Sequence, residues 1–365
     1  RYTAYAQGER NLSGRVEIAE GLTAPSAALK IGDISYKADG QGEFTGEARR
    51  PDEPQPDIIY GDRETQMMKG VKSASLGSAA FWRGNNNDLQ RRMGDLRLGE
   101  ENTGVWVRYL GGKMSLDDKG TNVNQTYNIM QVGYDQKLED WTVGVAGEYG
   151  KSDISYSNGN AEGKLGGFAL YGTWQGATGD YFDIIGKVSS IKNEYKVYND
   201  MGHRLDANYK TTGTSLSMEY GKRFEQPGGF YVDPSVELTI GRLAGRDYDA
   251  VSDIAGKVMH VQQNGISSTV GRIGIGIGQK TEKSNVFLKL SLAHEFSGKV
   301  RNTFSAVGEP TSTTEIDLKD TWLDLELGGS CQISENAYVY GTFTKDFGAK
   351  LKNKWRADVG VRFTF

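Results

Sequence analysis

The final eleven residues of the chain alternate strictly between apolar side chains and polar or small ones. The apolar positions are Trp355, Ala357, Val359, Val361, Phe363 and Phe365, and between them stand Arg356, Asp358, Gly360, Arg362 and Thr364. A period of two residues is that of a β-strand with one apolar face. Strands of soluble sandwiches can alternate too, but an unbroken apolar face that ends on an aromatic residue favours a strand that crosses a membrane.

The same alternation recurs in eleven segments further upstream. They are Thr103 to Asp117, Gln125 to Leu138, Asp140 to Ser157, Gly163 to Gly176, Gly179 to Tyr198, Ala207 to Gln226, Phe230 to Asp249, Met259 to Thr281, Ser284 to Val300, Thr314 to Ser334 and Asn336 to Gly348. Each is longer than the roughly 9 to 11 tilted residues that cross a bilayer. The sequence therefore predicts an all-β fold, a twelve-stranded antiparallel transmembrane β-barrel.

The connections between these segments indicate which ends of the strands lie on the same side. Short connections near Glu139, Ala177, Pro227, Glu282 and Glu335 alternate with connections near Asn122, Asn158, Met201, Ala255 and Gly308, which we expect to be mostly longer. Short turns on one side and longer loops on the other are typical of outer-membrane barrels.

The composition excludes several other classes of protein. No run of 18 apolar residues occurs, so the chain does not cross a membrane with helices. Its 43 Lys and Arg nearly balance 47 Asp and Glu, which gives no sign of a nucleic-acid partner. The histidines at 203, 260 and 294 have no metal-ligand spacing, and one cysteine cannot form an intramolecular disulfide. We expect neither a metal nor a cofactor.

The alternation also assigns a face to each side chain. One face of the strand that begins at Phe230 carries Val232, Pro234, Val236, Leu238 and Ile240, and the other carries Tyr231, Asp233, Ser235, Glu237 and Thr239. The apolar face must contact lipid, because a charge there costs a few kcal/mol. Cys331 is in register with Leu323, Leu325 and Leu327, so we expect it to face lipid as well.

Upstream of the barrel the composition changes. Residues 51–62 begin with a proline-rich acidic stretch that indicates a linker, and residues 1–50 contain short alternating segments such as Gly14 to Ile18 and Ala28 to Gly32. Residues 63–99 lack proline and favour helix. We expect a helix that ends near Arg97, lies in the lumen and leads into a barrel over residues 100–365. The N-terminus has no export signal, which we expect to lie upstream or to have been removed.

The segment Arg92-Met93-Gly94-Asp95-Leu96-Arg97, followed by twelve strands that end on Phe365, resembles the translocator domain of classical autotransporters. These are the type V secretion proteins of Gram-negative bacteria. The resemblance implies an outer-membrane anchor that exports its own N-terminal passenger to the cell surface, with residues 1–50 as the end of that passenger. It also implies outer-membrane lipid and the barrel assembly machinery as partners.

The barrel is further similar to those of the enterobacterial serine-protease autotransporters, which release the passenger by cleaving the lumenal helix after an asparagine. The resemblance implies that the Asn87 side chain attacks its own backbone carbonyl and cuts the bond to Asp88. That subfamily has a second asparagine where this chain has Asp88. The reaction is at most a single-turnover self-cleavage, and it does not make this fragment a turnover enzyme.

Three acidic residues match the subfamily's assisting carboxylates. They are Asp183 in Tyr181 to Lys187, Glu219 in Glu219 to Phe224, and Glu237 in Asp233 to Leu238. The alternation independently turns all three toward the lumen. Alternatively, the three acids have no role in cleavage and, like most lumenal acids, bind only water and basic side chains. Arg91, Arg92 and Arg97 are expected to be ion-pair partners that hold the helix.

Three other functions remain open from the sequence. A porin-like outer-membrane channel would use the same barrel, although a lumenal helix argues against it. An anchor for an uncleaved surface adhesin would lack the self-cleavage. An outer-membrane hydrolase would need a catalytic constellation, which the dispersed histidines do not supply.

Overall fold

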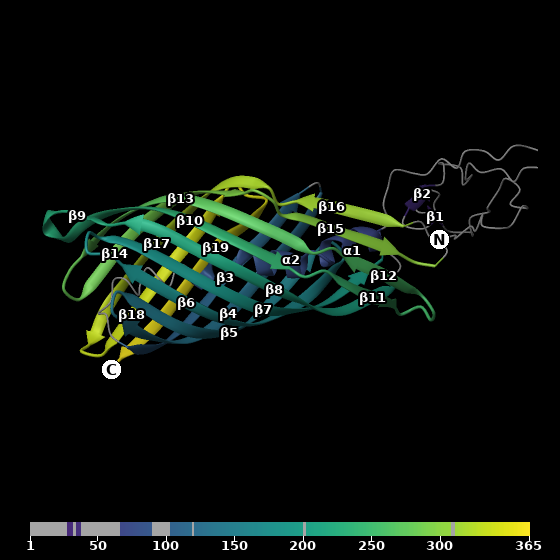
Figure 1. Ribbon diagram of the computed structural model, residues 1–365. Coiled ribbons are helices and arrows are strands. Elements are labelled where there is room, and N and C mark those ends of the chain that lie inside the picture. Colours follow the sequence, from purple (N-terminus) through teal and green to yellow (C-terminus); the bar gives the residue numbers. More distant parts are fainter. Residues whose placement is uncertain are drawn as a thin grey trace, which may run out of the picture.

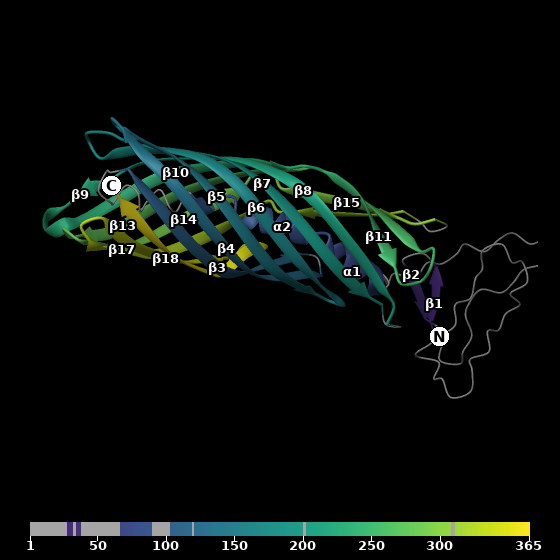
Figure 2. The same cartoon turned by 90° about the horizontal axis from the view of Figure 1, so that it is seen from below.

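Strands between Gly104 and Thr364 form a closed antiparallel barrel with two short helices inside it (Figures 1 and 2). The computed structural model describes residues 28–31, 34–37, 66–89, 103–118, 120–199, 202–307 and 311–365. Within these ranges the barrel has twelve strand positions, because five of them consist of a main strand and a shorter continuation. The predicted fold class is confirmed.

The strands run in sequence order around the barrel. Their bounds are β3 (Gly104–Asp118), β4 (Thr121–Leu138), β5 (Trp141–Tyr156), β6 (Gly159–Gln175), β7 (Asp180–Tyr198), β8 (Arg204–Lys222), β10 (Phe230–Leu243), β13 (Ile266–Lys280), β14 (Ser284–Glu295), β17 (Asp320–Ser334), β18 (Ala337–Phe347) and β19 (Leu351–Thr364). The continuations are β9 (Phe224–Glu225), β11 (Arg246–Ser252), β12 (Val258–Gln263), β15 (Lys299–Ser305) and β16 (Ser312–Asp317). The last strand, β19, pairs with the first, β3, and leaves no open sheet edge.

The two ends of the barrel differ, as the sequence predicts. Strands β11, β12, β15 and β16 extend one end, and the C-terminus and β9 lie at the other (Figure 1). The expectation of longer connections is wrong at two places on the extended side. Asp118 and Thr121, and likewise Tyr156 and Gly159, are separated by two residues each. Positive φ angles at Gly120 and Asn158 allow these tight turns.

Side chains alternate between lipid and lumen as predicted. On β17, Leu323 and Leu327 are exposed, whereas Asp324 and Glu326 between them are buried. Cys331 is exposed on the same face as the leucines, in agreement with the sequence. The register inferred from alternation is therefore correct on this strand.

Two helices occupy the lumen. They are α1 (Gln66–Ala74) and α2 (Gly77–Gly84), and both views in Figures 1 and 2 place them inside the barrel. Every described residue of α2 from Gly77 to Arg83 is buried, so the helix is enclosed on all sides. None of the described helices is long and apolar enough to cross a membrane.

Small residues on the barrel wall make room for the helix. The Trp82 ring is 2% exposed, and a Cβ atom added at Gly213 on β8 would lie 2.4 Å from its Nε1. A Cβ atom at Gly241 on β10 would lie 2.9 Å from its Cζ2. On the helix side, a Cβ atom at Gly77 would lie 2.9 Å from Ile154. The helix packs closely against the wall at these glycines, because a larger side chain at any of them would overlap with Trp82 or Ile154.

A cluster of tyrosines packs beside the helices in the lumen. The rings of Tyr209 and Tyr248 stack with centroids 4.1 Å apart, and the hydroxyls of Tyr195 and Tyr248 are 2.9 Å apart. The Tyr209 hydroxyl also lies 2.8 Å from Ser78 Oγ on α2. These hydrogen bonds satisfy buried polar groups and connect the helix to the wall.

Two further strands, β1 (Ala28–Ile31) and β2 (Ile34–Lys37), pair as an antiparallel hairpin. The second of the two short segments expected near the N-terminus is thus a strand. The first, Gly14 to Ile18, and the linker at 51–62 lie outside the described residues.

Candidate functional site

The chain leaves its regular helix just before the predicted cleavage position. Helix α2 ends at Gly84, residues 85–87 form a turn, and helical backbone resumes at Asp88 and Leu89. The expectation of a helix that runs through Asn87 is therefore wrong at this point. Asparagine side chains compete for backbone hydrogen bonds, which disfavours the helix interior. Here Asn85 Nδ2 donates to Phe81 O at 2.9 Å.

Asn87 lies against one of the three predicted carboxylates. Its Nδ2 donates a hydrogen bond to Glu237 Oε1 at 3.4 Å, and the residue is 7% exposed. Glu237 Oε1 also accepts from Arg272 Nη1 at 3.2 Å and from Thr239 Oγ1 at 3.5 Å. A carboxylate thus lies beside the nitrogen that would act as the nucleophile.

The three predicted acids form a single row on the barrel wall. Asp183 on β7 is the direct partner of Glu219 on β8, and Glu219 is the direct partner of Glu237 on β10. Asp183 accepts a hydrogen bond from Thr173, and Glu219 accepts one from Lys289 Nζ at 3.3 Å. Partner residues on adjacent strands are about 5 Å apart, so the structure brings all three acids together.

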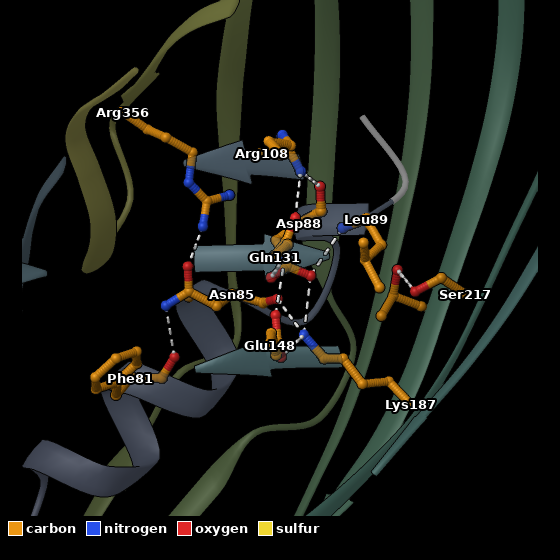
Figure 3. Close-up of polar contacts among 12 residues, drawn as sticks. Phe81, Asn85, Asp88, Leu89, Arg108, Gln131, Glu148, Lys187, Ser217 and Arg356 are labelled. Atoms are coloured by element: carbon orange, nitrogen blue, oxygen red, sulfur yellow. Dashed lines mark hydrogen bonds and ion pairs between the residues drawn. The ribbon is translucent and has the colours of Figure 1, made fainter. Parts of the chain in front are cut away.

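Asp88 is held on its own set of partners (Figure 3). Its Oδ1 accepts from Lys187 Nζ at 2.9 Å and from Leu89 N at 2.7 Å, and its Oδ2 accepts from Gln131 Nε2 at 2.8 Å. Its backbone carbonyl accepts from Arg108 Nη1 at 2.8 Å. Asp88 is fully buried, and these contacts neutralise its charge and fix both sides of the residue.

The wall residues that hold Asp88 belong to a larger polar network that the sequence analysis missed. Lys187 Nζ lies 3.1 Å from Glu148 Oε1, Gln131 Nε2 donates to Glu148 Oε2 at 2.9 Å, and Arg108 Nε donates to Asp358 Oδ2 at 2.6 Å. The alternation of side chains along β7 could have identified Lys187 as a lumenal residue. Lys187 follows Asp183 by four residues on β7, which places both on the lumenal face.

A small polar cavity borders the turn. It is lined by Asn87, Arg83, Arg272 and Asp324 among others, and its volume is about 10 Å³. A cavity of about this size holds one water molecule when polar groups surround it. The cavity therefore has room for one water molecule beside Asn87.

The arginines at 91, 92 and 97, predicted to hold the helix, lie outside the described residues. The described arginine of the helical segment is Arg83. Its Nε donates to Glu295 Oε1 at 3.3 Å, and its guanidinium lies 4.7 Å from the ring centroid of Trp322. An ion pair between the lumenal segment and the wall is thus present at this position.

Comparison with known proteins agrees with this architecture. Residues 105–344 match the family described as Autotransporter beta-domain. The chain belongs to the autotransporter β-domain family.

Relatives of this autotransporter barrel share moderate identity across most of the chain. Pertactin autotransporter of Bordetella parapertussis is 26% identical over 334 residues, which cover 87% of this chain and 35% of the relative. Serine protease pet autotransporter of Escherichia coli is 28% identical over 313 residues, which cover 83% of this chain and 22% of the relative. The chain thus spans about a third or less of the length of these relatives.

Solved autotransporter barrels have the same fold. The translocator domain of NalP from Neisseria meningitidis covers 81% of this chain and 100% of that domain, with a TM-score of 0.67 and 14% identity. The β-domain of Bordetella BrkA covers 72% of this chain and 100% of that domain, with a TM-score of 0.56 and 20% identity. The barrel is an outer-membrane translocator that anchors an N-terminal passenger and exposes it on the cell surface.

Proposed function

We propose that this autotransporter translocator cuts its own chain once between Asn87 and Asp88, after the passenger has been exported. The observation that carries the proposal is the hydrogen bond from Asn87 Nδ2 to Glu237 Oε1. It joins the one nucleophile that the reaction needs to a group that can accept its proton.

The reaction balances within the chain. Asn87 Nδ2 attacks the Asn87 carbonyl carbon and forms a succinimide ring, and the bond from that carbon to Asp88 N breaks. Nδ2 gives up a proton, which Glu237 accepts, and Asp88 N gains one and becomes an amino terminus. Water then opens the succinimide, and the small cavity beside Asn87 supplies a place for it. No metal or cofactor enters the sequence of steps.

The turn at 85–87 and the network around Asp88 support the required geometry. Ring closure needs a backbone that can rotate at Asn87, and a turn permits this where a continuous helix would not. Asp88, which replaces the asparagine of the enterobacterial subfamily, binds Lys187 and Gln131. Its carboxylate is thereby neutralised and does not oppose ionisation of the row of acids.

Asp183 and Glu219 continue the row beyond Glu237, and we assign them a proton-relay and positioning role. Glu219 is paired with Lys289 and Glu237 with Arg272. Each cation holds its carboxylate in place beside the next acid of the row. In this assignment Glu237 is the catalytic base, because it touches the reacting side chain.

The test uses the full chain expressed in outer membranes. We expect the wild type to yield a barrel fragment that begins at Asp88, identified by N-terminal sequencing. Asn87→Ala removes the nucleophile and should leave one chain of 40.0 kDa. Glu237→Gln keeps the shape but removes the base, so cleavage should slow by about 10² to 10⁴-fold.

Asp135→Asn is the matched control. Asp135 is a buried lumenal carboxylate that accepts hydrogen bonds from Tyr171 and Arg362 rather than from Asn87. Its variant should cleave at the wild-type rate. An intact wild-type chain in membranes with a folded barrel would contradict the proposal and leave an uncleaved anchor as the function.

We also propose the boundaries and partners that follow from this role. Residues 1–50 would be the end of the passenger, 51–62 a linker, and 63–99 the segment that enters the lumen. The apolar outer face supports contact with outer-membrane lipid. The terminal strand, with Phe363 and Phe365 exposed on that face, supports recognition by the barrel assembly machinery.

A further inference from the structure

Four lysines form a straight row on the outer surface of the barrel. Lys151 on β5 is the direct partner of Lys164 on β6, which partners Lys192 on β7, which partners Lys210 on β8. Their chain neighbours Gly150, Leu165, Ile191 and Tyr209 are buried. The lysines therefore point outward, on the same face as the side chains that contact lipid.

The row lies at the extracellular limit of the lipid-facing band. At the opposite limit Trp141, Trp174, Phe182 and Tyr220 are direct partners in an equivalent row on the same four strands. Ten residues separate the aromatic from the lysine on each strand. At 3.4 Å per residue and a tilt of 40°, the two rows are roughly 26 Å apart along the barrel axis.

This separation is that of the apolar band of outer-membrane barrels, about 25 Å with an aromatic girdle at its edge. On β5 the outward residues between the two rows are Val143, Val145, Gly147 and Tyr149, all uncharged. The four lysines thus stand where the hydrocarbon ends and the headgroups of the outer leaflet begin.

The four positive charges of the row lie next to one another on adjacent strands and repel each other. Like charges directly opposite each other on adjacent strands destabilise a sheet. Lys192 pairs with Glu194, the next outward residue on its strand. Lys151, Lys164 and Lys210 lie in no salt bridge within the described part of the chain, but Glu194 also attracts Lys164, and the next outward residues on β5 and β6 are the acids Asp153 and Glu162.

We propose that this row, Lys151, Lys164, Lys192 and Lys210, binds the phosphate groups of the phosphorylated glycolipid of the outer leaflet. Four lysines about 4.8 Å apart cover about 14 Å, a length that reaches both phosphates of a bis-phosphorylated disaccharide. Lysine binds phosphate as a point charge, so the site fixes the headgroup by charge and spacing.

The row of lysines is inclined to the membrane plane, and this inclination is compatible with phosphate binding. Partner residues lie perpendicular to tilted strands, so the row rises by about 3 Å from one strand to the next at a tilt near 40°. The flexible apolar stem of lysine lets each ammonium group move toward the headgroup level.

The experiment measures lipid binding by the folded, purified full chain in detergent, with native mass spectrometry as the readout. The probes are bis-phosphorylated lipid A, the same lipid after removal of its phosphates, and phosphatidylglycerol. We expect the wild type to bind bis-phosphorylated lipid A at least tenfold more tightly than either other lipid. Substitution of all four lysines by glutamine should remove this preference.

The matched control changes four lysines at the other end of the barrel, Lys137, Lys222, Lys280 and Lys283, to glutamine. It alters the net charge equally and should retain the preference for bis-phosphorylated lipid A. If the quadruple variant of the row does not fold, the pair Lys151→Gln and Lys210→Gln, at the two ends of the row, should reduce binding at least threefold.

Two results would overturn the proposal. One is equal binding of bis-phosphorylated and dephosphorylated lipid A by the wild type, which would remove phosphate recognition. The other is a wild-type affinity for phosphatidylglycerol equal to that for bis-phosphorylated lipid A, or a loss of lipid A binding in the control variant equal to that in the row variant. Either outcome would mean that binding depends only on the total positive charge.

Discussion

Replacement of Lys187 by methionine should destabilise the docked segment strongly. The Lys187 side chain is 4% exposed and lies 2.9 Å from Asp88 and 3.1 Å from Glu148, both of which are buried. Methionine fills a similar volume, so the change removes the charge without leaving a cavity. Breaking a buried ion pair from one side typically costs about 3 to 5 kcal/mol, because the remaining charge stays without compensation.

This cost can be converted into a shift of the melting temperature. The entropy of unfolding is about 2.1 cal/mol/K per residue, so for a chain of roughly 300 folded residues 1 kcal/mol corresponds to about 1.6 °C. The Lys187→Met barrel should therefore melt about 5 to 8 °C below the wild type. The assay is loss of the folded band in gel mobility after heating, together with near-ultraviolet circular dichroism in detergent.

The same strand supplies the control. Lys192 forms an ion pair with Glu194, but these side chains are 28% and 40% exposed. Exposed pairs contribute about 0 to 1 kcal/mol, so Lys192→Met should lower the melting temperature by less than about 2 °C. Adding Asp88→Asn to Lys187→Met should recover part of the loss. Equal melting of both single variants would show that the buried pair does not form as described.

Three further predictions concern facing, fit and assembly. Leu325→Arg should cost about 2 to 4 kcal/mol near the bilayer midplane, whereas Glu326→Gln keeps the shape of a lumenal side chain and should cost less in heat-shift gels; equal damage would mean that the register is wrong. Gly213→Val should cost about 1 to 3 kcal/mol by overlap with Trp82, and calorimetry should show recovery when Trp82→Ala is added; no recovery would place the ring elsewhere. Deletion of Phe365 should reduce the amount of folded barrel in outer membranes, and unchanged yield would remove its role in recognition.

Local patterns were sufficient to predict the strands and their faces, because the side-chain period of a strand is fixed by its backbone. The inward direction of Asp183, Glu219 and Glu237 and the outward direction of Cys331 both followed from that period. That the three acids are direct partners could not be predicted. Pairing register depends on the closure of the whole barrel, which no single strand determines.

The cleavage segment shows a second limit of local reasoning. Residues 63–99 predicted helix correctly for α1 and α2, but the turn at Asn87 is fixed partly by contacts from distant strands. Arg356 on β19 binds Asn85 Oδ1, and Arg108 on β3 binds the carbonyl of Asp88. Such contacts override helix propensity, which is a weak preference.

The fit of Trp82 against the barrel wall has a consequence for the cell. Its ring lies against the backbone of two adjacent strands, so an exported chain and the docked helix cannot fill that cross-section at the same time. A chain exported through this lumen would have to pass before the helix docks. The docked helix narrows the lumen at this level, which limits what an outer membrane filled with such barrels would let through.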